Sequence, residues 1–79
     1  MTVKILFFGA TADAVGKRRV EVPLDAETPA GSVFDQVLKE FPQLKDRKLL
    51  FSVNQEYTGA DRLVRDGDEL AIFTAVSGG

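Results

Sequence analysis

The sequence of 79 residues contains no cysteine and no histidine. Without cysteine the chain cannot form a disulfide, and it has neither a thiol nucleophile nor a thiolate metal ligand. Without histidine it lacks the usual general base near neutral pH and the commonest protein ligand for metals. These two absences argue against a self-contained enzyme and predict that the chain holds no metal.

Long apolar segments and an excess of positive charge are missing as well. No apolar run approaches the roughly 20 residues of a membrane span, and residues 1–4 do not resemble the start of a secretory signal. The net charge is −2 and the isoelectric point is about 5.0, whereas a nucleic-acid-binding surface needs a basic stripe. We therefore expect a cytoplasmic protein that binds neither membrane nor nucleic acid.

Two charged clusters are interpreted as solvated turns. The basic run of residues 17–19 is followed by Glu21 and Asp25, which we expect to offset its charge. The acidic residues within 66–69 fall in one tight turn around Gly67, and they are interpreted as turn formers and not as a metal or acid–base site.

Hydrophobic periodicity predicts where the strands lie. Residues 3–8 and 69–76 are apolar at both odd and even positions, which is typical of strands covered on both faces at the centre of a sheet. Residues 19–24 alternate, and Pro23 places that strand at an edge. Shorter strands are expected near residues 49–53 and 62–64.

One main helix is expected between these strands, and Pro42 should end it. Ser32 with Asp35 resembles a capping box, and Thr28-Pro29 is a second possible start. After Gly9, at most one further helical turn is expected, capped by Thr11 or Asp13. A single apolar stripe should face the core, formed by Val33, Phe34, Val37, Leu38 and Phe41.

The resulting order, β-β-α-β-β-β, places the first and last strands side by side in parallel. One helix on one face of a mixed sheet of about five strands is the β-grasp, or ubiquitin-like, arrangement of an α+β fold. A chain this short buries one core, so we expect residues 1–79 to form a single domain.

The last two residues of the sequence, Gly78 and Gly79, follow an apolar segment closely. At average glycine usage, a chain ends in two glycines by chance about 0.5% of the time. Glycine has no Cβ, so such a tail is narrow enough to enter an enclosed site. We expect a reactive carboxylate on Gly79, although an ordinary frayed terminus is the alternative.

Three segments resemble a known family, the small subunits of molybdopterin synthase, which are ubiquitin-like sulfur carriers of molybdenum-cofactor biosynthesis. They are the I-L-F-F of residues 5–8, the V-N-Q of residues 53–55, and the D-G-D-E-L-A-I-F of residues 66–73 before the V-S-G-G of residues 76–79. The resemblance spans nearly the whole chain, and its third segment is the most specific. The Gly-Gly end alone is shared with the thiamine-pathway sulfur carrier and with ubiquitin-like modifiers.

This resemblance implies a mechanism. An ionised α-carboxylate is a poor acyl donor, and in the family an E1-like enzyme uses ATP and Mg²⁺ to adenylate it. A sulfur donor then forms a thiocarboxylate, here on Gly79, while Gly78 allows the tail to thread into the active site of the large synthase subunit within a heterotetramer. There the sulfur passes to a cyclic pyranopterin precursor. The carrier itself has no permanently bound cofactor.

The resemblance also implies the contact residues. Phe8, Tyr57 and Phe73 stand where family members place apolar partner contacts, and Val76 and Ser77 belong to the tail that enters the partner. From the pattern alone, Phe8 and Phe73 could instead belong to the core, whereas the polar neighbours of Tyr57 favour exposure.

Two departures from the family pattern stand out. Ala12 replaces a common arginine, which puts in doubt a polar contact to the activating enzyme at that position. Thr74 and Ala75 replace two common prolines, so the last strand could stay paired for longer. Three other functions remain open: a thiamine-type sulfur carrier, a protein modifier joined to lysines through Gly79, and a plain β-grasp interaction domain with an incidental tail.

Overall fold

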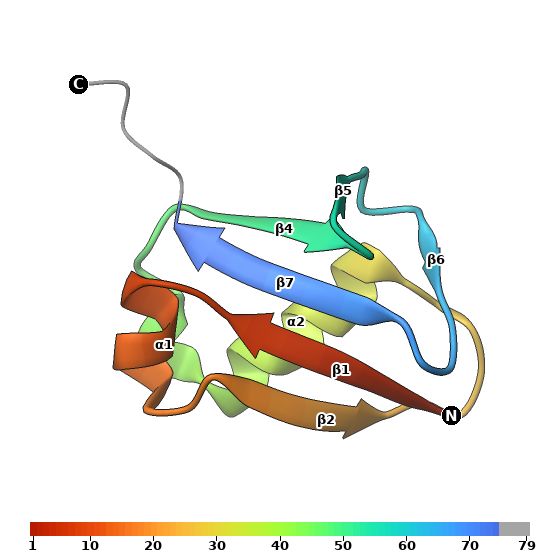
Figure 1. Ribbon diagram of the computed structural model, residues 1–79, viewed down its shortest axis with the longest axis horizontal. Coiled ribbons are helices and arrows are strands. Elements are labelled where there is room, and N and C mark those ends of the chain that lie inside the picture. Colours follow the sequence, from red (N-terminus) through yellow and green to blue (C-terminus); the bar gives the residue numbers. More distant parts are fainter. Residues whose placement is uncertain (75–79) are drawn as a thin grey trace.

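The computed structural model describes residues 1–74. Within them, a mixed five-stranded sheet of order β2-β1-β7-β4-β5 carries one long helix, α2, across one face, while β3 and β6 form a separate two-stranded sheet (Figure 1). In chain order the elements are β1 (Thr2–Phe7), α1 (Ala10–Val15), β2 (Arg19–Pro23), β3 (Thr28–Pro29), α2 (Ala30–Glu40), the 3₁₀ helix η1 (Pro42–Leu44), β4 (Leu49–Val53), β5 (Glu56–Tyr57), β6 (Leu63–Val64) and β7 (Glu69–Thr74).

The first and last of these strands pair in parallel near the centre of the sheet. Ile5 lies opposite Leu70, and Phe7 lies opposite Ile72. β2 pairs antiparallel with β1 at one side, and β4 pairs antiparallel with β7 at the other. The predicted β-grasp arrangement is therefore confirmed, and the strand that contains Pro23 lies at an edge as expected.

The core lies entirely on the side of the sheet that faces α2. Val3, Ile5, Leu70 and Ile72 are completely buried there, and the predicted stripe of α2 packs against them. The intervening residues of β1 and β7 are only half-buried, so the prediction that both faces of these strands are covered is wrong. The reason is that apolar residues on the second face have no helix above them within residues 1–74 (Figure 1).

The start of α2 follows the second of the two predicted positions, Thr28-Pro29, although Pro29 is the cap residue and not the first helical residue. The helix begins at Ala30 without any side-chain cap, so the expected capping box at Ser32 and Asp35 does not form. Its first amides donate instead to backbone carbonyls of the loop before β6, Ala30 N–H to Arg62 at 2.7 Å and Gly31 N–H to Ala60 at 2.8 Å. These bonds satisfy helix-end donors that would otherwise lack partners. The helix ends before Pro42, as predicted.

A short helix, α1, occupies the segment where at most one helical turn was expected. It begins after Gly9, whose φ of 57° lies in the left-handed region. Neither Thr11 nor Asp13 caps it, because the cap residue is Gly9 and no side chain forms a capping hydrogen bond. Thr11 is buried. No helix among the described residues is long and apolar enough to cross a membrane.

Two turns are joined at the end of the sheet where β7 begins. Asn54, with φ of 50°, donates its side-chain N–H to Asp68 Oδ1 at 3.0 Å and accepts the Glu69 N–H at 3.0 Å. Asp68 Oδ2 also accepts the Arg65 N–H at 2.8 Å. The hydrogen bond from Asn54 is the largest cause that lowers the pKa of Asp68 below its ordinary 3.8, and partial burial opposes it. This acidic cluster therefore forms turns, as predicted.

The lowered pKa of Asp68 predicts a pH-dependent contribution to stability. A carboxylate whose pKa is lower in the folded state stabilises the fold above its unfolded pKa, and this is lost as the pH falls through the folded value. Asp68→Asn should lower the free energy of unfolding by about 1 kcal/mol at pH 7, and the difference from wild type should shrink at pH 2.5. Urea unfolding at both pH values measures this.

Asp46→Asn is the matched control, because Asp46 is exposed and its side chain makes no hydrogen bond within residues 1–74. A difference between wild type and Asp68→Asn that stays the same at both pH values would contradict the electrostatic explanation.

Candidate functional site

The face of the sheet opposite α2 carries a group of apolar side chains near the end of β7. Leu6 of β1 lies opposite Ala71 of β7, and Leu50 of β4 lies opposite Phe73. One further residue along the parallel register places Phe8 beside Phe73. We call this group the outer apolar patch, and its members are Leu6, Phe8, Leu50, Tyr57, Ala71 and Phe73.

The aromatic members of the patch are exposed to solvent to different degrees. Tyr57 is 76% exposed, Phe8 is 52% exposed and Phe73 is half-buried. The rings of Tyr57 and Phe73 meet edge to face, with centroids 5.8 Å apart and planes at 76°, an arrangement favoured by aromatic quadrupoles. The sequence left open whether Phe8 belongs to the core, and the structure places it outside. Tyr57 is exposed as expected, although it lies in the short strand β5 and not in a loop.

The other phenylalanines lie on the α2 side of the sheet and pack against one another. Phe7 contacts Phe41 edge to face at 5.6 Å, and Phe34 contacts Phe51 at 5.2 Å. The aromatic residues of the outer apolar patch therefore lie on the opposite face of the sheet from the phenylalanines of the core. Contiguous exposed apolar groups of this kind are typical of interaction sites.

Charge divides the outer face of the sheet along its length. At the end where β7 begins, Lys4 lies between Glu21 of β2 and Glu69 of β7. The apolar side chains of the outer apolar patch lie toward the other end, where β7 ends at Thr74. The patch is therefore close to the point from which the chain continues toward its last residues.

Four of the residues predicted to form the site lie outside the described part of the chain, namely Val76, Ser77, Gly78 and Gly79. The structure brings the three others, Phe8, Tyr57 and Phe73, onto one face. Leu6, Leu50 and Ala71 were not predicted, because their place beside the aromatic residues depends on strand register. Their apolar character alone gave no signal of a surface position.

The two departures from the family pattern can be placed in part. Ala12 lies half-buried on α1. Thr74 pairs with Leu49 of β4, so the last strand does stay paired as far as this residue, whereas Ala75 lies outside the described residues.

A buried hydroxyl fixes the backbone of Phe8. The Phe8 N–H donates both to the Thr11 side-chain oxygen at 3.0 Å and to the Ile72 carbonyl at 3.1 Å. The same Thr11 oxygen lies 2.7 Å from the Phe8 carbonyl oxygen and 3.0 Å from the Ile72 carbonyl oxygen. A hydroxyl has one proton and two lone pairs, so it shares its proton between these two carbonyls. Thr11 thereby joins the ends of β1 and β7 beneath the outer apolar patch.

Within residues 1–74, no group of three or more acidic, histidine or cysteine side chains is placed to hold a metal ion. What the structure presents is a rigid apolar surface beside the end of the last strand.

Comparison with known proteins assigns the family. The ThiS family matches residues 5–79. The chain belongs to the ThiS family. Together with the relatives described next, this match confirms the resemblance to molybdopterin synthase small subunits seen in the sequence.

Two relatives and a solved structure are similar over nearly the whole chain. The molybdopterin synthase sulfur carrier subunit of Escherichia coli K12 is 36% identical, over 98% of this chain and 99% of that protein. The subunit of the same name from Mycobacterium tuberculosis is 34% identical, over 98% and 96%. The crystal structure of SAMP1 from Haloferax volcanii superposes with a TM-score of 0.87 at 26% identity, and 100% of both chains is covered.

The hydrogen bonds of Thr11 predict how its substitution will act. Thr11→Val keeps the shape but removes the hydroxyl, so it should cost about 1–2 kcal/mol of stability. It should also speed amide hydrogen exchange at Phe8 by about threefold or more, because the Phe8 N–H then keeps only its bond to the Ile72 carbonyl. Thr11→Ser, which keeps the hydroxyl and loses a methyl group, should leave that exchange slow. Equal exchange in the two variants, measured by NMR, would show that the hydroxyl does not fix this backbone.

Proposed function

We propose that this chain is the sulfur-carrier subunit of a molybdopterin synthase. The observation that carries the proposal is the outer apolar patch, placed where β7 leads toward Gly78 and Gly79, on a chain without cysteine or histidine. The names of the E. coli and M. tuberculosis relatives support it. Such a chain is suited to carry a reactive group to a partner and unsuited to perform the chemistry by itself.

The proposed chemistry takes place on the carboxylate of Gly79. In an E1-like enzyme that binds ATP and Mg²⁺, a carboxylate oxygen attacks the α-phosphorus of ATP, and pyrophosphate leaves. A sulfur donor at the oxidation level of hydrosulfide then attacks the acyl carbon. AMP leaves with the electron pair of the C–O bond, and the thiocarboxylate and a proton result. The requirement for ATP is consistent with a cytoplasmic location.

The large synthase subunit then receives the charged carrier. Its surface would cover the outer apolar patch, with Phe8, Tyr57 and Phe73 as the main contacts. Val76, Ser77 and Gly78 would pass the tail into the active site, where the sulfur is transferred to a cyclic pyranopterin precursor. Burial of aromatic side chains is a common source of interface affinity. A pair of carriers and a pair of large subunits would form a heterotetramer.

Intact-mass analysis tests the chemistry directly. After incubation with the E1-like enzyme, ATP and a sulfur source, the protein should gain the mass of one sulfur in place of one oxygen, mapped to Gly79. A variant with one residue added after Gly79 is the matched control, and it should remain unmodified because its carboxylate would lie beyond the activating site. No gain in the unextended chain, or an equal gain in both, would contradict the mechanism. A gain without transfer to the pyranopterin precursor would indicate a thiamine-type carrier.

The docking surface can be tested separately. Tyr57→Glu and Phe73→Glu should each weaken binding to the large subunit by about tenfold or more, because each buries a charge in an apolar contact. Leu63→Glu is the matched control, since Leu63 is also exposed, at 46%, but lies on β6 outside the patch. Calorimetry measures the affinities, and circular dichroism checks the fold. Unchanged binding by folded Tyr57→Glu and Phe73→Glu would show that this face is not the interface.

A protein modifier is the second candidate, and the similarity to SAMP1, a small archaeal modifier protein, favours it. The activation step would be the same, but Gly79 would form isopeptide bonds with lysine side chains. Lysine adducts bearing the C-terminal residues of this chain, found by mass spectrometry of host extracts, would support this function.

A further inference from the structure

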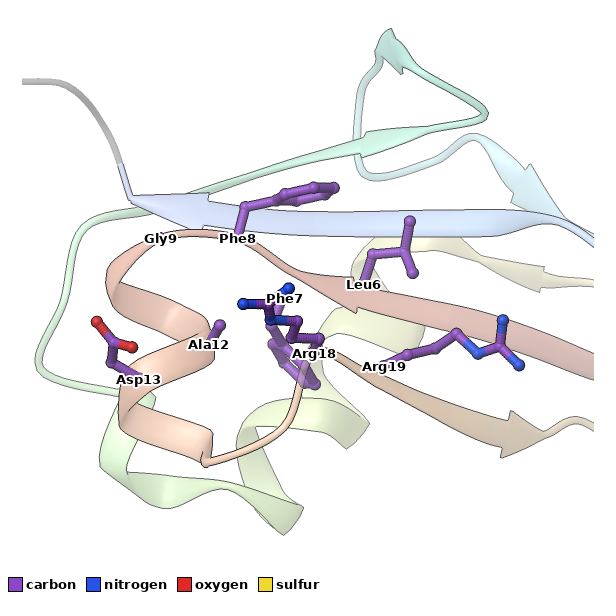
Figure 2. A pocket seen from close by; sticks show the side chains of 8 residues that line it. All are labelled: Leu6, Phe7, Phe8, Gly9, Ala12, Asp13, Arg18 and Arg19. Atoms are coloured by element: carbon purple, nitrogen blue, oxygen red, sulfur yellow. The ribbon is translucent and has the colours of Figure 1, made fainter.

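A basic groove continues from the outer apolar patch toward the edge of the sheet. It has a volume of about 500 Å³ and lies between the end of β1, helix α1 and the start of β2 (Figure 2). Leu6 and Phe8, which also belong to the patch, line it together with Ala12, and Arg18 and Arg19 provide its charge. The groove and the patch therefore form one continuous surface.

The positive charge of this groove is not neutralised within the described residues. Lys17, Arg18 and Arg19 are all exposed, and none of them forms an ion pair within residues 1–74, where both ion pairs involve arginines of the β6 region. The basic run of residues 17–19 is therefore a solvated turn and strand start, as expected. Glu21 makes no ion pair with it, because its register places it beside Lys4.

An acidic side chain at the rim does not alter this picture. Asp13 contributes to the lining, but its carboxylate lies on the other side of the α1 ribbon from Arg18 (Figure 2). Two guanidinium groups thus stand beside an apolar floor on a chain whose net charge is −2. Guanidinium groups match carboxylates in geometry and are weakly hydrated, which suits them to interfaces.

We propose that this groove binds an acidic segment of the large synthase subunit, with an apolar side chain of that segment on Leu6 and Phe8 and its carboxylates against Arg18 and Arg19. The proposal rests on the proposed function, because the protein that covers the outer apolar patch also reaches the groove. Complementary charge at such a rim steers association and sets the orientation of the complex. The tail of the carrier would then approach the active site in one register.

A charge-reversal experiment tests the proposal. The double variant Arg18→Glu/Arg19→Glu should bind the large subunit about tenfold or more weakly at 50 mM salt, mainly through slower association. The difference from wild type should narrow at 500 mM salt, because exposed charges are screened there. The control Lys39→Glu/Lys45→Glu makes the same change in net charge at exposed sites on α2 and after η1, and it should bind like wild type.

The possible outcomes separate the groove from the rest of the proposed function. Equal weakening in both double variants would mean that net charge alone matters, and it would overturn the proposal. Unchanged binding by Arg18→Glu/Arg19→Glu, with loss of binding by Tyr57→Glu, would reject the groove and keep the patch. If Arg18→Glu/Arg19→Glu weakened adenylation by the E1-like enzyme but bound the large subunit normally, the groove would serve the E1-like enzyme, and the proposed partner would be wrong. Absence of a thiocarboxylate would reject the proposed function itself.

Discussion

The parallel pairing of β1 with β7 is the constraint on which the rest of this structure depends. A parallel pair cannot be closed by a tight turn, so the chain between the two strands must cross the sheet, and α2 makes that crossing. The same pairing brings the end of the first strand, with Phe8, beside the end of the last strand. The patch, the groove and the exit of the chain toward its final glycines therefore share one end of the molecule.

Covering only one face of the sheet explains the functional surface. The single main helix covers every second residue of the strands, including Phe7 and Phe51, and the apolar residues between them face solvent. If charged residues covered the whole outer face of the sheet, that face would offer a partner no apolar surface. Here Lys4 and its acidic neighbours cover one half and the aromatic residues the other, so the half nearest the end of β7 is free to bind a partner.

Hydrogen bonds brace this surface from both ends. Asn54 and Asp68 join the β4–β5 turn to the start of β7, and the Thr11 hydroxyl joins the ends of β1 and β7. Under the proposed function, the chain would contribute to catalysis by presenting a reactive group, and a pre-ordered surface lowers the entropy lost on docking. The basic groove beside Phe8 extends the same surface with Arg18 and Arg19, the charges that we propose bind an acidic segment. Under the proposed function, apolar contacts beside the end of β7 suit delivery of a group on Gly79 into another protein's active site.

The sequence by itself determined the β-grasp arrangement, the amphipathic helix and the edge strand with Pro23, because periodicity and composition are local properties. It could not decide whether Phe8 and Phe73 were core or surface, since apolar residues of both parities look alike until a layer covers one face. Strand register alone placed Leu6 and Leu50 beside them. The hydrogen-bond acceptors of the first amides of α2 came from a loop some 30 residues later in the chain, and the groove at Arg18 came from the packing of α1 against the sheet. Contacts between segments distant in sequence decided these features, and no local pattern records them.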